Sequence, residues 1–105
     1  MDFVFEITDK TGRKIHLTKE RWTHIKKHSH MDENMMEELK KILKEGSIIR
    51  YSEDNENVLF YYREFKKMPS EERYLFVSVK YLNNEGFVVT SFFTNKITGL
   101  KWMKK

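Results

Sequence analysis

Residues 74–94, YLFVSVKYLNNEGFVVTSFFT, decide the fold of this chain. Two runs rich in β-branched and aromatic residues, Tyr74–Tyr81 and Phe87–Thr94, flank the polar break NNEG. This composition is typical of strands, and a short break with turn residues predicts that the two strands pair as an antiparallel hairpin. We therefore expect these residues to form the centre of an antiparallel sheet.

The length of the turn decides which side chains share a face of this hairpin. A three-residue loop places Ser78 opposite Thr90, and Lys80 opposite Val88. A two-residue loop instead places Lys80 beside Phe87. We favour the three-residue loop because it leaves one apolar face, made of Leu75, Val77, Val79, Phe87, Val89 and Phe93. The second face then carries a polar group together: Lys80, Ser78, Thr90 and Thr94.

Two earlier runs have the same composition: Ser47–Tyr51 and Val58–Phe65. The polar break SEDNEN separates these two runs, and the break KKMPSEE separates the second run from the strand that begins at Tyr74. Such short connections favour a four-stranded antiparallel meander, since parallel strands need long crossovers. An N-terminal hairpin is also expected, because Phe3–Ile7 alternates loosely, DKTG predicts a turn, and Lys14–Leu17 follows.

Two helices are expected between the hairpin and the meander. Thr18 can cap a helix that runs to about Ser29, and Asp32 is a good N-cap for a second helix that ends before Gly46. The second helix has one apolar stripe at the helical period, made of Met35, Met36, Leu39, Ile42 and Leu43. Packing of this stripe on the sheet predicts an α+β fold, in which an N-terminal hairpin and two helices precede a four-stranded antiparallel sheet. The length of 105 residues suits a single domain.

Composition excludes several classes of protein. The chain has no cysteine, which excludes disulfides, thiolate metal sites and a cysteine nucleophile. Its longest aliphatic-aromatic run, Val58–Tyr62, is far shorter than the ~20 residues of a membrane helix, and its first residues lack a signal-peptide pattern. We therefore expect a cytoplasmic protein that does not associate with membranes.

The charge of the chain is mildly basic, because 20 Lys and Arg against 16 Asp and Glu give a net charge of +4. This balance permits attraction to a polyanion such as RNA, although an ordinary solvated surface explains it equally well. Four lysines gather near the end of the sequence: Lys96, Lys101, Lys104 and Lys105.

The stretch RWTHIKKHSH, residues 21–30, contains three of the four histidines. On a helix, Arg21, His24 and His28 fall within an arc of about 60°, beside the apolar stripe. The pattern admits a catalytic pair, a metal clip or an exposed basic helix end. Ile25 stands where the zinc motif HExxH has its glutamate, so we predict no metal and no cofactor. The two remaining histidines are expected to be incidental: His16 and His30.

A polar sheet face beside a helix with arginine and histidine suits the cleavage of RNA without a metal. In that reaction the ribose 2′-hydroxyl attacks its own phosphate, and the enzyme supplies a base, an acid and cations. Histidine suits the first two roles because its ordinary pKa is ~6.5, while Arg and Lys stabilise charge on the phosphate. Aromatic rings could stack unpaired bases, and the candidates are Tyr51, Tyr62 and Phe92. A non-catalytic module that binds RNA or a protein is the alternative.

The run RWTHIKKHSHMDENMMEELKKIL, followed by VLFYYREF, YLFVSVKYL and GFVVTSFFTNKI, resembles a phage-associated nuclease-like family of the barnase/EndoU/colicin/RelE-like superfamily. Members of that family show a His-Ile-x-x-x-His helix, a second helix, a "yyr"-like strand, a "v-V-K" strand and a final strand that reads roughly "v-T-a/s". The resemblance covers about Leu17 to Ile97. It implies an RNase/RelE-like fold and a toxin-like or phage-linked endoribonuclease, with an antitoxin protein as a candidate partner.

Carried over by position, the resemblance implies five catalytic residues: His24, His28, Arg63, Lys80 and Thr90. We add five candidates for substrate binding: Arg21, Tyr62, Ser78, Thr94 and Lys96. The helix motif of this chain has no acidic residue that could serve as a carboxylate base, so histidine would have to take that part.

Overall fold

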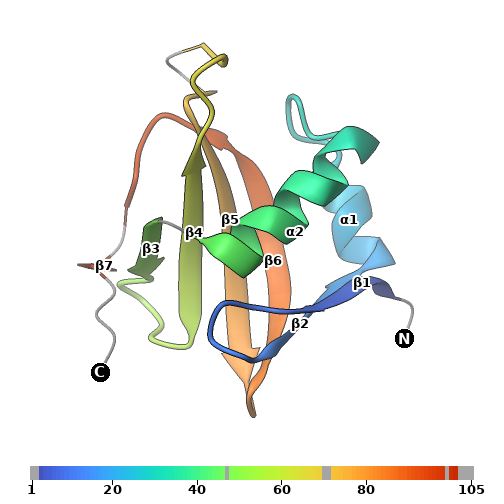
Figure 1. Cartoon of the computed structure of the whole chain (residues 1–105), viewed down its shortest axis with the longest axis vertical. Helices are drawn as coiled ribbons and strands as arrows, with labels where there is room; N and C mark the ends of the chain where they lie inside the picture. The colour runs from blue at the N-terminus through green and yellow to red at the C-terminus, as the bar shows by residue number, and fades with distance from the viewer. Residues whose placement is uncertain (1–2, 47, 70–71, 99, 102–105) are drawn as a thin grey trace.

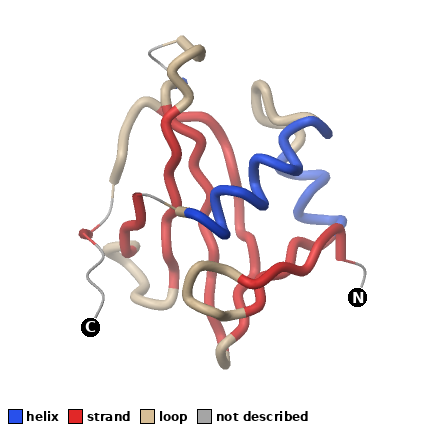
Figure 2. Tube along the Cα trace, in the orientation of Figure 1, coloured by secondary structure: helices blue, strands red, loops and turns tan. Residues whose placement is uncertain are grey.

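The hairpin at residues 74–94 is the centre of one large sheet in the computed structural model, which describes residues 3–46, 48–69, 72–98 and 100–101 (Figures 1 and 2). The strands within these described ranges are β1 Phe3–Thr8, β2 Lys14–Thr18, β3 Ile48–Tyr51, β4 Val58–Glu64, β5 Tyr74–Leu82, β6 Glu85–Thr94 and β7 Leu100–Lys101. Three helices lie between β2 and β3: α1 Lys19–Ile25, the 3₁₀ helix η1 Glu33–Met35, and α2 Met36–Glu45.

The α+β class is confirmed, but the expected four-stranded sheet is too small. The strand order is β1-β2-β6-β5-β4-β3-β7, so the N-terminal hairpin joins the same sheet. It does so through a parallel pairing of β2 with β6, in which His16 lies beside Phe87. The other strand pairs among the described residues are antiparallel. Strand patterns in the sequence gave no sign that the edge of β6 accepts a strand from 70 residues earlier.

Gly86 lies in this parallel pairing, beside Ile15 of β2. A Cβ atom at this position would lie 2.9 Å from Tyr81 Cε1, 2.9 Å from Val79 Cγ1 and 3.1 Å from Ile15 Cγ1. The two distances of 2.9 Å, both to side chains of β5, are too short for a real Cβ contact, and the distance to Ile15 of β2 is unusually tight. Glycine therefore relieves crowding at the point where β5 and β2 flank β6.

The first helix is shorter than predicted, because it ends at Ile25 and does not reach Ser29. The backbone tightens there: the Lys27 N–H donates to the His24 carbonyl at 3.2 Å, and the His28 N–H donates to the Ile25 carbonyl at 3.0 Å. Bonds of this i→i+3 type belong to turns and 3₁₀ helices. His28 therefore lies in the loop after α1 and does not share a helix with His24.

The predicted caps occur, with one shift. The Thr18 hydroxyl accepts from the Arg21 N–H at 3.2 Å and starts α1. Asp32 accepts from the Asn34 N–H at 2.9 Å, but it caps η1, and α2 begins only at Met36.

The two helices cover one face of the sheet, which we call the helix face; the opposite side is the outer face (Figure 1). Leu39, Ile42 and Leu43 of α2 belong to the same buried core cluster as the alternate residues of β5. Among the side chains expected on the apolar face, Phe87 and Val89 are not there. Val88 and Gly86 lie on the helix face instead, because the bulge in β6 exchanges the faces of the residues between the turn and Val89.

The hairpin has a two-residue turn, and the predicted three-residue loop is wrong. Asn83 and Asn84 both have positive φ angles, 52° and 67°, as the favoured two-residue hairpin turns require. Lys80 consequently pairs with Phe87. The register then shifts after Ser78, which faces Thr90 as predicted, because the bulge at Val89 inserts one residue.

A buried carboxylate fixes the β1–β2 turn to the helix face. Asp9 is 6% exposed and accepts hydrogen bonds from the Tyr81 hydroxyl at 2.5 Å, the Thr11 N–H at 2.8 Å and the Arg13 N–H at 2.9 Å. The Tyr61 hydroxyl lies 2.6 Å from that of Tyr81 and completes the cluster. Nearby, the Lys10 ammonium donates to the carbonyl of Gly46 at the end of α2.

The environment of this cluster shifts three pKa values. Burial favours a raised pKa for Asp9, but the hydrogen bonds from Tyr81, Thr11 and Arg13 together lower it below its usual value. Burial raises the pKa of Tyr61 to about 12. Burial, with Tyr61 and Asp9 close by, also raises the pKa of Tyr81.

Candidate active site

The outer face carries three cross-strand rows of side chains that bear on function. The lowest row contains His16, Phe87, Lys80 and Val58; the middle row contains Thr90, Ser78, Phe60 and Arg50; the upper row contains Phe92, Phe76, Tyr62 and Ile48. Successive rows are two residues apart along β5, which corresponds to about 6.7 Å. The middle row therefore lies one step from Lys80 and one step from the aromatic residues of the upper row.

Aromatic rings touch along the whole upper row. The ring centroid of Phe76 lies 5.2 Å from that of Tyr62 and 4.7 Å from that of Phe92. Phe60 adds a further contact with Phe76 at 5.1 Å. At the end of the row, the His28 imidazole lies 5.5 Å from the Phe92 ring. The histidine is thus held against an aromatic wall built by β4, β5 and β6.

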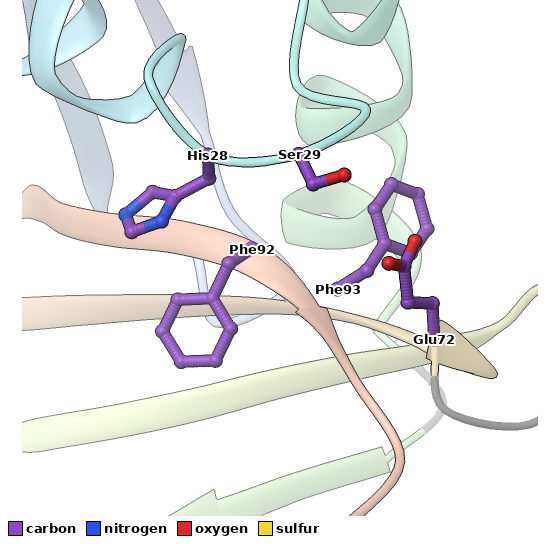
Figure 3. A pocket seen from close by; sticks show the side chains of 5 residues that line it. All are labelled: His28, Ser29, Glu72, Phe92 and Phe93. Carbon is purple, nitrogen blue, oxygen red and sulfur yellow. The ribbon is translucent and has the colours of Figure 1, made fainter.

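His28 reaches the outer face because β6 has an open edge. The ladder between β2 and β6 extends only as far as Phe87, and α1 packs against β6 beyond it. The loop after α1 then carries His28 past this edge to Phe92. Figure 3 shows the two rings next to each other on one side of a pocket, with Phe93 and Glu72 on its other side.

The polar residues predicted on the sheet lie together on the outer face. Lys80 is exposed and has no ion pair within the described part of the chain, and Thr90 is half-buried beside buried Ser78. Thr94 lies opposite Tyr74, one row beyond the aromatic row. These positions agree with the expected polar face, and the bulge in β6 brings Thr90 to it.

Tyr62 lies in the aromatic row but does not have a free ring. Its side chain is 1% exposed, and its hydroxyl both contacts the Thr98 hydroxyl and accepts from the Thr98 N–H, each at 3.1 Å. Thr98 belongs to the segment that runs from β6 to β7 (Figure 1). The expected stacking of a base on Tyr62 is therefore not supported, whereas Phe92, in the same row, is half-buried.

Arg63 is the one predicted catalytic residue that the sheet turns away from the others. It pairs with Leu75 and so lies on the helix face, where its Nη1 is 3.2 Å from Glu38 Oε2 of α2. The outer face instead carries Arg50, in the same row as Ser78 and Thr90.

The remaining candidates lie around the rim. His24 and Arg21 are exposed on α1, and neither has an ion pair or ring contact with another described side chain. Lys96 is exposed just after β6. The side chain of Lys101 and the residues Lys104 and Lys105 lie outside what the structure describes.

A metal centre finds no support in the described ranges, where no three His, Asp or Glu side chains gather to hold an ion. His16, expected to be incidental, is buried between two carboxylates: its Nδ1 lies 3.1 Å from Glu6 Oε2 and its Nε2 lies 3.4 Å from Glu85 Oε1. Its ring also stacks on Phe3 at 4.5 Å.

The chain matches a known protein family. The profile of PBECR2, described as "phage-Barnase-EndoU-ColicinE5/D-RelE like nuclease2", matches residues 4–105. The chain belongs to this nuclease-like family. Searches among curated proteins and among solved structures found no match. The family resemblance drawn from the order of the motifs is thereby confirmed.

Membership in PBECR2 points to nucleic acid as the class of substrate, because the family is named for nucleases. Histidine, lysine and hydroxyl groups are chemically able to supply the proton transfer and charge stabilisation that phosphodiester cleavage needs. Separately, none of the helices in the described residues is both long enough and apolar enough to cross a membrane.

Proposed function

We propose that this protein is an endoribonuclease that cleaves RNA without a metal ion, on the outer face of its sheet. The observation that carries the proposal is the position of Thr90. It lies one row from Lys80 and, on the other side, one row from the aromatic row that holds His28. A phosphate bound at Thr90 would be within the reach of both side chains.

The reaction that fits these groups is an attack by the neighbouring 2′-hydroxyl. A base removes the 2′ proton, the 2′-oxygen forms a bond to phosphorus, and the bond from phosphorus to the 5′-oxygen breaks. An acid then gives a proton to the 5′-oxygen, so the products carry a 2′,3′-cyclic phosphate and a 5′-hydroxyl. The transition state gains negative charge on the phosphate, which nearby cations stabilise.

The positions of these side chains support the following roles. His28 acts as acid or base, and exposed His24, near the end of α1, is its proposed complement. Lys80 stabilises the charge on the phosphate, and Thr90 positions the phosphate through its hydroxyl. Arg50 takes the part that the motif comparison gave to Arg63. Contacts with neighbouring phosphates fall to residues around the rim, namely Arg21, Thr94 and Lys96.

The test is incubation of the protein with end-labelled RNA in the presence of EDTA. We expect cleavage products that end in a 2′,3′-cyclic phosphate, and a loss of about 100-fold in rate for His28→Ala and for Lys80→Ala. Lys41→Ala is the matched control, because Lys41 lies on α2 beside the helix face. RNA binding without any product would indicate a non-catalytic RNA-binding module. Cleavage that both site variants retain would contradict the proposed site.

A toxin of this kind needs an antitoxin that covers the outer face. Because the proposed site is cationic, the partner should present an acidic surface. Addition of such a partner should stop cleavage and protect Lys80 from chemical acetylation. Inhibition without that protection would place the partner elsewhere on the molecule.

A further inference from the structure

A pocket of about 360 Å³ opens at the end of β6, and the proposed mechanism uses only one of its side chains (Figure 3). Its lining consists of His28, Ser29, Glu72, Phe92 and Phe93. Three of these residues present flat rings, one presents a hydroxyl and one presents a carboxylate. A pocket of this size, mostly apolar and with few polar groups, has the character of a small-ligand site.

Glu72 is the polar group that distinguishes this pocket. Its Oε2 atom is shielded from solvent and has no hydrogen-bond partner of good geometry in the described structure, although His30 Nε2 lies 3.1 Å away. A buried carboxylate oxygen without a hydrogen bond costs free energy. The Glu72 side chain is 26% exposed and lines the pocket, so the carboxyl group remains partly accessible to a ligand.

Three segments build the pocket: the loop after α1, the end of β6, and the residues just before β5 that include Glu72. The loop after α1 contains three consecutive residues that contribute to the pocket or to its surroundings. His28 and Ser29 line it from the loop after α1. His30, with a left-handed φ of 64°, turns back so that its Nε2 faces Glu72 and its ring meets Phe93 edge-on at 6.3 Å. His28 of this loop thus supplies a ring to the pocket, and His30 of the same loop orients the carboxylate of Glu72.

We propose that this pocket binds one unpaired guanine base of the RNA substrate. An ionised carboxylate only accepts hydrogen bonds. The Watson–Crick edge of guanine offers two adjacent N–H donors to such a group, whereas adenine, cytosine and uracil each offer donors from a single nitrogen. The Phe92 and His28 rings give the base a surface on which to stack.

The position of the pocket joins it to the proposed cleavage site, and this part of the inference rests on the proposed function. His28 belongs both to the pocket and to the end of the aromatic row. Thr90 lies one row away from Phe92, about 6.7 Å along the strand. A guanine held here places its own phosphate next to the proposed catalytic groups, so cleavage should occur beside guanosine.

The test uses nucleotides, so that base recognition is measured without catalysis. Guanosine 3′-monophosphate and adenosine 3′-monophosphate are titrated into the ¹⁵N-labelled protein, and amide shifts are followed by NMR. We expect guanosine monophosphate to bind about 10-fold more tightly and to shift the amides of residues 28–30 and 92–93, because a hydrogen bond to a charged group supplies a preference of this size.

Variants of Glu72 measure how much its carboxylate contributes to the preference for guanosine monophosphate. Glu72→Gln should remove the preference for guanosine monophosphate, and Glu72→Asp, which keeps both acceptor oxygens, should retain part of it. Glu53→Gln is the matched control: Glu53 is exposed in the β3–β4 turn, so this substitution removes the same charge from a position outside the pocket. The wild-type comparison decides the question even if a Glu72 variant does not fold.

The outcomes separate this inference from the proposed function. Equal affinity for the two nucleotides, or shifts confined to another surface, would overturn the guanine assignment even if RNA is cleaved. A preference for guanosine monophosphate in a protein that cleaves no RNA would support the pocket assignment and refute the endoribonuclease. Cleavage beside guanosine, lost in Glu72→Gln and kept in Glu53→Gln, would support both.

Discussion

The two faces of this sheet are built by the same strands and treat polar groups in opposite ways. On the helix face, Asp9 is buried and hydrogen-bonded to Tyr81, Thr11 and Arg13. Near the end of β6, the shielded Oε2 of Glu72 lies 3.1 Å from His30 Nε2 without a hydrogen bond of good geometry, and on the outer face Lys80 has no ion pair within the described residues. The difference teaches that satisfied polar groups hold this fold together, whereas unsatisfied ones mark where a ligand is expected.

The largest effect should come from removing the buried, hydrogen-bonded carboxylate on the helix face. Asp9→Ala removes the acceptor for the Tyr81 hydroxyl and for two backbone N–H groups of the β1–β2 turn. We expect a loss of about 3 kcal/mol in the free energy of unfolding, measured with urea. Asp9→Asn, which keeps one acceptor oxygen, should lose less. A loss below about 1 kcal/mol for the alanine variant would show that the cluster is not a major source of stability.

A substitution on the outer face should lower the cleavage rate strongly and change the free energy of unfolding little. His28→Ala exchanges an exposed side chain, so the urea midpoint should move little. The cleavage rate should fall about 100-fold, which corresponds to roughly 2.7 kcal/mol in the activation barrier. Arg63→Ala, on the helix face, should leave the cleavage rate unchanged. A larger loss of rate in Arg63→Ala than in His28→Ala would reverse the assignment of the two faces.

Packing at the parallel strand pair gives the next effect. Gly86→Ala forces a methyl group against Tyr81, Val79 and Ile15, and we expect a cost of about 2 kcal/mol. Gly12→Ala is the control, because Gly12 has a φ of 89° but no atom within 4 Å of the added Cβ. It should lose only about 1 kcal/mol, from backbone strain. Equal losses in the two variants would mean that crowding by the side chains of β5 and β2 contributes nothing at Gly86.

The pKa values of the buried phenols predict sensitivity to alkali. The folded protein holds the pKa of Tyr61 at about 12, above its ordinary 10.0, so the unfolded chain releases this proton first. The contribution of Tyr61 is therefore complete below about pH 10 and is lost between pH 10 and 12, by at most ~1.4 kcal/mol per pH unit. Tyr81, whose pKa is also raised, adds a second such term.

Urea unfolding at intervals from pH 8 to 11.5 would measure this dependence. Tyr61→Phe should reduce the slope above about pH 10, because one of the two titrating phenols is gone. The same steep slope in Tyr61→Phe would assign the alkaline loss to other groups.

The smallest effect concerns the aromatic row. Tyr62→Phe keeps the ring and removes only the hydroxyl that contacts Thr98, so we expect a loss of about 1 kcal/mol in unfolding free energy. Tyr51→Phe, at a half-buried ring in β3, serves as the control and should change stability less. If Tyr62→Phe destabilises as much as Asp9→Ala, then the outer face also carries a major stabilising hydrogen bond and the contrast between faces weakens.

The sequence predicted the strands and caps well because these depend on local patterns. The pairing of Ser78 with Thr90 was also predicted, but from the wrong turn. A short turn and a bulge together give the same pairing as a longer turn without a bulge. A bulge has no reliable local signature, so the faces of Phe87 and Val89 were assigned incorrectly.

The candidate site was harder to predict because it depends on contacts between distant segments. Arg63 was favoured by the order of motifs, yet the ladder with Leu75 turns it to the helix face and leaves Arg50 on the outer face. The pocket is less predictable still. Glu72 lies 42 positions after His30, and nothing in either local pattern indicates that the two side chains meet.

The parallel pairing of β2 with β6 has a consequence for biosynthesis. Lys14 and Glu85 are neighbours in the sheet but are made far apart in time, so the N-terminal hairpin leaves the ribosome long before its partner strand exists. Until then, the edge of β2 has no strand to bond, and such edges readily pair with other chains. Closing so long a loop is also slow. Chaperone demand and aggregation during synthesis should therefore depend on how quickly translation reaches the Asn83–Asn84 turn.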